Sequence, residues 1–164
     1  MTRQNITEKI WYDPDVKSYI MLDVTEDIPE QKPVVIDGTK LLPKSEYHCT
    51  LVPAGKLSED PAIVARVIED VADYLRYNSQ AVRFIGLADR YYICKDGDEV
   101  TLIAEATLVG LGGLRKIVQQ TIPDYAPALP HVTLLKNDES TYGIGIHSAM
   151  DLKKLCRRVN LDDV

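Results

Sequence analysis

The chain has 164 residues, of which 45% are hydrophobic and 27% charged, the composition of a globular domain with a substantial core. Its formal net charge of −6 argues against charge-driven binding along a nucleic-acid duplex, although a short or single-nucleotide substrate could still bind in a locally basic site. No stretch approaches the roughly 18 apolar residues of a membrane span, and Met1–Trp11 contains no signal-peptide core. These features predict a cytoplasmic protein with no membrane partner.

The N-terminal part of the sequence predicts a loose arm followed by short strands. Residues 1–16 are polar and mixed, so we expect a flexible arm there and a single domain over 17–164. The apolar runs at 19–22 and 33–36 each indicate a strand, and Asp37-Gly38 is a turn signal that ends the second one.

The clearest predicted helix begins at Asp60, which suits the N-cap, with Pro61 at the first helical position. Asn78-Ser79 ends it. Apolar residues at helical spacing give this helix a core-facing stripe: Val64, Val67, Ile68, Val71 and Leu75.

The second half of the chain predicts more strands and a hairpin. The strand-like runs are 81–85, 90–94 and 100–107. Between the last two, Lys95-Asp96-Gly97-Asp98 is a hairpin signal. A second helix is expected over 111–120, followed by a proline-punctuated loop over 123–130.

Near the C-terminus, residues 142–146 suggest a short strand. Ser148 and Asp151 form a capping-box-like start of a final helix that reaches about Val159. The predicted elements do not follow a strict βαβ order. The sequence therefore predicts an α+β fold with largely antiparallel sheets.

The three cysteines give no sign of a covalent framework. Cys49, Cys94 and Cys156 are odd in number, widely spaced and without CxxC spacing. Neither a disulfide framework nor a zinc knuckle is expected.

One short motif, His-x-Thr-Leu, occurs twice in the sequence, as His48-Cys49-Thr50-Leu51 and as His131-Val132-Thr133-Leu134. Each copy lies in a short apolar run that predicts a strand. Because side chains alternate along a strand, the His and Thr of each copy point to the same face. Two such strands brought together would present two imidazoles and two hydroxyls, the groups needed for acid–base chemistry on a phosphoryl group.

The doubled pattern, His48, Thr50 and Leu51 with His131, Thr133 and Leu134, resembles the 2H phosphoesterases, a family of cyclic phosphodiesterases and 2′-5′ RNA ligase-like proteins. The run 17–24 is similar to the family's first strand, and the order of elements fits over roughly 17–158. The resemblance implies two lobes, each a small antiparallel sheet with helices outside, and a central cleft flanked by the two motif strands.

Hydrolysis of a cyclic phosphodiester needs a base for water, an acid for the departing ribose oxygen and donors for the phosphoryl oxygens. His48 and His131 can supply the acid and the base near neutral pH, in either order. Thr50 and Thr133 can donate to the non-bridging oxygens. This chemistry requires no metal or other cofactor. A zinc or iron site is the alternative, but no HxH or HExxH pattern is present and Glu46 is the only acidic neighbour of a motif in sequence.

The expected substrate is a nucleotide or RNA-end phosphodiester, above all a 2′,3′-cyclic phosphate. Tyr47, Tyr125 or Tyr142, which are near the motifs in sequence, could stack on its base, whereas packing in the core is the other expectation for each of these rings. A cyclic dinucleotide is a second possible substrate class, and a nucleotide- or RNA-binding module without turnover is the alternative from another class. His147 lacks the hydroxyl partner and is expected to be a surface residue or to cap the last helix. The cations at 153–158 are expected to stabilise that helix through its dipole. The sequence leaves the oligomeric state open.

Overall fold

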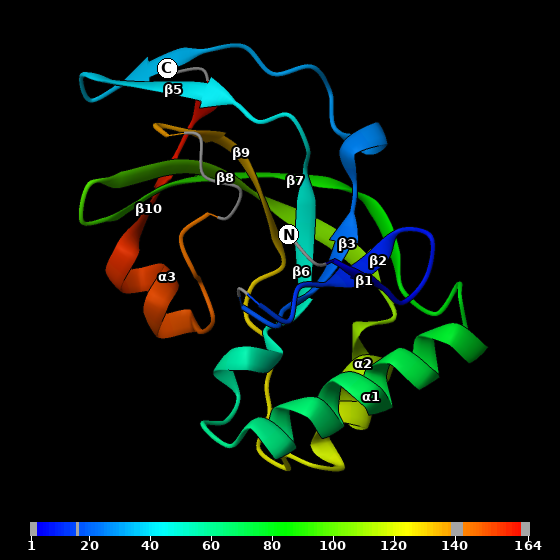
Figure 1. Ribbon diagram of the computed structural model, residues 1–164. Coiled ribbons are helices and arrows are strands. Elements are labelled where there is room, and N and C mark those ends of the chain that lie inside the picture. Colours follow the sequence, from blue (N-terminus) through cyan, green and yellow to red (C-terminus); the bar gives the residue numbers. More distant parts are fainter. Residues whose placement is uncertain (1–2, 16, 139–142, 162–164) are drawn as a thin grey trace. The chain divides into compact units, whose positions relative to one another are not determined.

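The computed structural model describes residues 3–15, 17–138 and 143–161 and has an α+β fold, as the sequence predicts (Figure 1). Strands pair antiparallel wherever their register is defined. The described residues form three α-helices. The chain divides into two compact units. Unit 1 comprises Met1–Asp23, Thr50–Ile85 and Leu108–Pro127; unit 2 comprises Val24–Cys49, Gly86–Thr107 and Ala128–Val164.

Unit 1 begins with three short strands, β1 (Gln4–Asn5), β2 (Ile10–Tyr12) and β3 (Ile20–Asp23), paired in that order. The expectation of a loose arm over 1–16 is wrong for residues 3–15, the part of that segment that the structure describes. Ile10 and Trp11 are only 3% and 5% exposed. Their burial stabilises a strand too short for its apolar pattern to stand out among the flanking polar residues.

Helix α1 (Pro61–Tyr77) forms as predicted. The Asp60 carboxylate accepts a hydrogen bond from the Ala62 N–H at 2.9 Å, which satisfies one of the unpaired donors of the first turn. Asn78 follows as the C-cap. Within the predicted stripe, Val67, Val71 and Leu75 are buried, whereas Val64 and Ile68 are partly exposed.

Helix α2 (Leu111–Gln119) packs beside α1 in the same unit (Figure 1). Gly110 precedes it with a φ of 93°, in the left-handed region, and a Cβ at this position would lie 1.7 Å from the Ala81 carbonyl oxygen. Glycine is therefore required here for close backbone approach and chain reversal. Gly110 therefore has a structural role at the start of this helix.

The two motif strands and three further strands run in the order β6, β9, β8, β7 and β10 in one sheet. Their bounds are β6 (His48–Val52), β9 (His131–Lys136), β8 (Glu99–Val109), β7 (Arg83–Asp96) and β10 (Cys156–Val159). β7 and β8 form the predicted hairpin, which turns at Gly97 with a φ of 60°. The two runs predicted at 81–85 and 90–94 merge into the single strand β7.

A second hairpin in unit 2 joins β4 (Val34–Ile36) to β5 (Thr39–Pro43) through the predicted Asp37-Gly38 turn. Both turn residues have positive φ, 53° and 80°. β5 also pairs with β9. Two short 3-10 helices, η1 (Thr25–Asp27) and η2 (Ala54–Lys56), complete the connections.

The C-terminal helix α3 (Ala149–Leu155) begins as predicted, with the Ser148 hydroxyl accepting a hydrogen bond from the Asp151 N–H at 3.1 Å. The expected end near Val159 is wrong, because strand β10 starts at Cys156 and pairs with β7. Residues 143–147 are not a strand, and Tyr142 lies outside the described residues.

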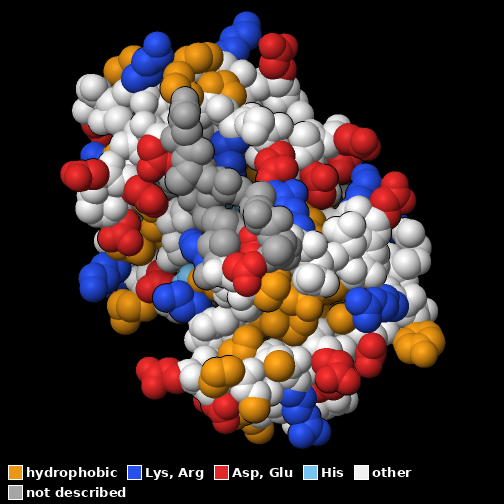
Figure 2. Space-filling view, viewed as in Figure 1, with side chains coloured by type: hydrophobic (Ala, Val, Ile, Leu, Met, Phe, Trp, Pro, Cys, Tyr) orange, Lys and Arg blue, Asp and Glu red, His pale blue; other side chains and the backbone are white. Residues whose placement is uncertain are grey.

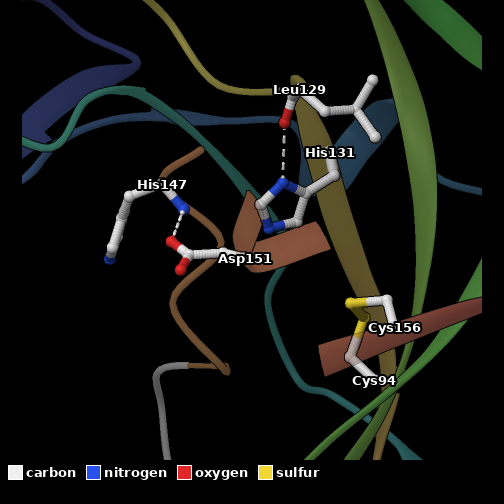
Figure 3. The surroundings of a disulfide bond; sticks show 6 residues. All are labelled: Cys94, Leu129, His131, His147, Asp151 and Cys156. Carbon is white, nitrogen blue, oxygen red and sulfur yellow. Dashed lines mark hydrogen bonds between the residues drawn. A yellow bond between two sulfur atoms is a disulfide. The ribbon is translucent and has the colours of Figure 1, made fainter. Parts of the chain in front are cut away.

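Cys94 of β7 and Cys156 of β10 are opposite one another in the sheet and form a disulfide with a Cα–Cα distance of 4.1 Å (Figure 3). The expectation that no disulfide is present is therefore wrong. The cysteines are far apart in sequence, and only the pairing of β10 with β7 brings them together. The disulfide packs with Ile103, Ile144 and Ile146 in a small core cluster of unit 2.

Among the described residues, no helix is both long and apolar enough to cross a membrane.

Candidate active site on the β6–β9 strand pair

The two motif histidines belong to unit 2 and lie on neighbouring strands, β6 and β9. β6 and β9 pair antiparallel with Cys49 opposite Val132, and both of these side chains are fully buried. This register places His48 opposite Thr133. Since opposed residues point to the same side of a sheet, and His131 is two residues from Thr133, these three side chains share one face.

His131 has a defined protonation pattern. Its Nδ1 lies 2.9 Å from the Leu129 carbonyl oxygen (Figure 3). Because a carbonyl can only accept, Nδ1 carries the proton and the Nε2 lone pair is left as an acceptor. Burial lowers the pKa of His131 below its ordinary value of 6.5, and the hydrogen bond to Leu129 offsets part of that shift. The ring is therefore mainly neutral at neutral pH.

Thr133 is held against the chain that follows β9. The side chain is only 8% exposed, and a Cβ built on Gly143 would lie 2.6 Å from its Oγ1. Gly143 thus packs directly on the Thr133 hydroxyl. The next residue, Ile144, belongs to the disulfide cluster, so this segment connects the second motif to that core.

Beside His131, the same face of the sheet continues with Glu105 of β8 and Arg90 of β7. In the pairing of β8 with β9, Glu105 lies directly opposite His131. Arg90 Nη1 donates to Glu105 Oε2 at 3.2 Å. Neither residue is predicted from the sequence, because neither is near a motif along the chain. The one sequence signal that could have indicated them is the hairpin turn after Cys94, if the residues of the two flanking strands had been aligned pair by pair from that turn.

Cys49, between His48 and Thr50, cannot act as a nucleophile near neutral pH. Burial raises the pKa of its thiol to about 12, although a hydrogen bond from the His131 backbone lowers that pKa in part. The thiolate is the reactive form of cysteine, and it is scarce at such a pKa. Cys49 therefore serves the core beneath the motif face.

Thr50 lies in unit 1, where its hydroxyl donates to Met21 Sδ at 3.2 Å. Thioether sulfur is a weak acceptor. Tyr47 and Tyr125, the two expected base-stacking residues, are only 8% and 6% exposed. Burial raises the pKa of both phenols, that of Tyr125 to about 12. Both rings therefore contribute to the cores of their units and expose little surface for a base.

His147 is at the start of α3, where its backbone N–H donates to Asp151 Oδ2 at 2.9 Å (Figure 3). Its Nε2 would lie 2.5 Å from a Cβ on Gly145. The structure places His147 next to Ser148, the N-cap of α3, where the sequence predicts a surface or capping residue.

A buried cation at the far end of β9 was not predicted. Lys136 is only 1% exposed and its Nζ lies 3.1 Å from Asp138 Oδ1. Burial, together with the charge of Lys136, lowers the pKa of nearby Lys44 to about 8, while Glu46 opposes the shift. On the surface, by contrast, basic and acidic side chains are interspersed on the face drawn in Figure 2.

Two cavities lie away from the motif residues. In unit 1, a cavity of about 660 Å³ runs along α1 and is lined by Val64, Ile68 and Arg76 among others. In unit 2, a smaller one of about 330 Å³ lies beside Asp37 and Arg157, which form an ion pair.

Comparison of the chain with protein-family models, with curated proteins and with solved structures finds no match. The residues of the motif face are the basis for assigning a function. They are His48, His131 with its Nδ1 bound to a carbonyl, the Thr133 hydroxyl and the Arg90–Glu105 pair.

Proposed function

We propose that this protein is a metal-independent phosphodiesterase of the 2H type. Its substrate is a nucleotide or RNA-end phosphodiester, above all a 2′,3′-cyclic phosphate. The observation that carries the proposal is the pairing of Cys49 with Val132, because it puts His48, Thr133 and His131 on one face of two adjacent strands. A two-lobed arrangement with the motif strands flanking a cleft is part of the proposal.

In this mechanism His131 is the base. Its neutral state and its available Nε2 lone pair suit it to remove a proton from water as the water oxygen attacks phosphorus. His48, as the imidazolium, is the acid. It gives its proton to the ribose oxygen as the bond from that oxygen to phosphorus breaks, leaving a phosphomonoester.

The two threonines are the proposed donors to the non-bridging oxygens. Thr133 is on the same face as both histidines, and the contact with Gly143 restricts its side chain. The Thr50 hydroxyl can exchange its weak sulfur acceptor for a phosphoryl oxygen, which accepts far more strongly. Fixed donors of this kind stabilise charge that develops on the oxygens in the transition state.

The test is a panel of cyclic phosphates and short RNAs, with the products resolved by phosphorus NMR in the presence of EDTA. We expect a 2′,3′-cyclic phosphate to be opened to one monoester faster than a linear 3′-5′ dinucleotide is cleaved. Loss of activity to the chelator with recovery on added zinc or manganese would contradict the metal-independent mechanism. Tight binding of every compound without product at any pH would contradict catalysis itself.

A further inference from the structure

Arg90 of β7 lies two strands away from His131 of β9, with β8 between them. Neighbouring strands are about 4.8 Å apart, so β7 lies roughly 10 Å from β9 across β8. Glu105, between them, is opposite His131 and bound to Arg90. The three residues therefore form a line across the sheet on the face that carries the motif.

The guanidinium of Arg90 is positioned and still has donors available. Its side chain is 57% exposed, whereas that of Glu105 is 17% exposed. A guanidinium carries five N–H donors, and among the described residues the one bond found for Arg90 is that to Glu105. Glu105 thus fixes the direction of the side chain while leaving N–H groups open to solvent.

The hairpin of β7 and β8 does not need the Arg90–Glu105 ion pair for its stability. An exposed ion pair contributes little to stability, and the hairpin is already closed by its turn at Gly97. Arginine held by a carboxylate offers a planar, permanently charged fork, the group best suited to a phosphate. In a chain with a net charge of −6, such a local cation also offsets the repulsion of an anionic substrate.

We propose that Arg90 binds a second phosphate of the substrate, adjacent to the phosphodiester that reacts at His48 and His131. This inference rests on the proposed function. A 2′,3′-cyclic phosphate ends its strand, so any second phosphate lies on the 5′ side of the same nucleotide. The substrate class is therefore an RNA end or a 5′-phosphorylated nucleotide, and a lone nucleoside cyclic phosphate is the poorer substrate.

The first experiment compares a nucleoside 2′,3′-cyclic phosphate with the same compound carrying a 5′-phosphate. For the wild type we expect kcat/KM to be about tenfold higher for the 5′-phosphorylated compound, mainly through KM, the size of effect typical of one charge-assisted hydrogen bond. Arg90→Met should bring the ratio of the two close to one, and Arg90→Lys should restore part of it. Arg83→Met, an exposed arginine on the same strand, should keep the wild-type ratio.

The second experiment measures binding without turnover, by calorimetry with a nucleoside 3′,5′-bisphosphate and with the 3′-monophosphate. We expect tighter binding of the bisphosphate by the wild type and loss of that preference in Arg90→Met. Hydrolysis without any preference for the 5′-phosphate, together with equal binding of both nucleotides, would overturn the Arg90 site and leave the proposed function intact. Selective bisphosphate binding without hydrolysis of any cyclic phosphate would support the Arg90 site and overturn the proposed function.

Discussion

The two copies of the His-x-Thr pattern have the same residues but different surroundings. The hydroxyl of Thr50 donates to the sulfur of Met21, whereas Thr133 is buried against Gly143. His131 is fixed through Nδ1 by a carbonyl oxygen two residues earlier, at Leu129. The difference shows that a short motif determines which side chains share a face, while the neighbouring strands and loops determine what each side chain can do.

The histidine of the second copy is enclosed by its neighbours. β9 lies between β6 and β8, and Glu105 of β8 is opposite His131. This enclosure removes water from the ring and lowers its pKa. In the proposed mechanism, this environment places the base in the second copy and the acid in the first.

Replacing either motif histidine tests whether both copies are needed. His48→Ala and His131→Ala should each lower kcat by about 10² to 10⁴, the usual contribution of a positioned acid or base. Steady-state rates on a 2′,3′-cyclic phosphate give the effect, and circular dichroism on melting checks that the fold is retained. His147→Ala is the matched control and should keep near wild-type turnover. A variant of either motif histidine that retains full activity would remove that copy from the mechanism.

The disulfide packs with Ile144, and the preceding residue, Gly143, contacts Thr133 of the second copy. Removal of the disulfide therefore perturbs the environment of the second copy. The bridge spans a sequence separation of 62 residues, for which the loop-closure model gives about 4 kcal/mol of stability. Cys94→Ser/Cys156→Ser should therefore lower the free energy of unfolding by up to that amount in urea. The wild type should lose the same stability when reduced, and the double variant should be insensitive to reductant. Equal stability of the oxidised wild type and the double variant would contradict this role.

Local signals in the sequence predict much of this fold. Asp60 and Ser148 cap their helices, Asp37-Gly38 and Gly97 turn their hairpins, and both motif segments are strands. In each case the information lies within a few residues of the chain.

Features that depend on register were not predictable in this way. The Cys94–Cys156 bond joins strands that one sequence pattern does not align. The Arg90–Glu105 pair lies within the predicted hairpin, but the turn signal alone does not give the register that pairs these two residues. A helix extended to Val159 was predicted because residues 156–159 contain cations that also suit a helix end. Pairing with β7 stabilises them as a strand instead. The burial that lowers the pKa of His131 is likewise a property of the assembled sheet.

Loss of the Thr133 hydroxyl should lower kcat more than loss of the Thr50 hydroxyl, because Thr133 is the more firmly held of the two. Thr133→Val removes a donor held on the motif face and should lower kcat by about a hundredfold, within the range seen for loss of one preorganised donor. Thr50→Val should cost about tenfold or less, since its hydroxyl must first leave Met21. Rates of both variants on one substrate give the comparison. Equal losses would show that the two hydroxyls act alike.

Gly143→Ala disturbs the second copy without touching its motif residues. The new Cβ would lie 2.6 Å from Thr133 Oγ1, so the hydroxyl or the segment must shift, and we expect kcat/KM to fall about tenfold. Gly112→Ala in α2 is the matched control, because a Cβ added there would meet no atom within 4 Å. That change should leave turnover intact and add up to about 1 kcal/mol of helix stability. Unchanged turnover in Gly143→Ala would show that the position of Thr133 is not critical.

The smallest expected effect concerns pH, and it follows from the environment of His131 alone. As the base must be neutral, kcat/KM should rise with pH through the pKa of His131, and burial places that midpoint below 6.5. The same shift couples to stability: between the folded and the unfolded pKa, the unfolded chain binds more protons, so stability falls as the pH drops below about 6.5 towards the folded pKa. His131→Gln should remove this part of the pH dependence of unfolding. NMR titration of the His131 ring, set beside the acidic limb of the rate profile, measures both. A ring pKa at or above 6.5, or a limb that does not follow the ring titration, would move the base to the first copy of the pattern.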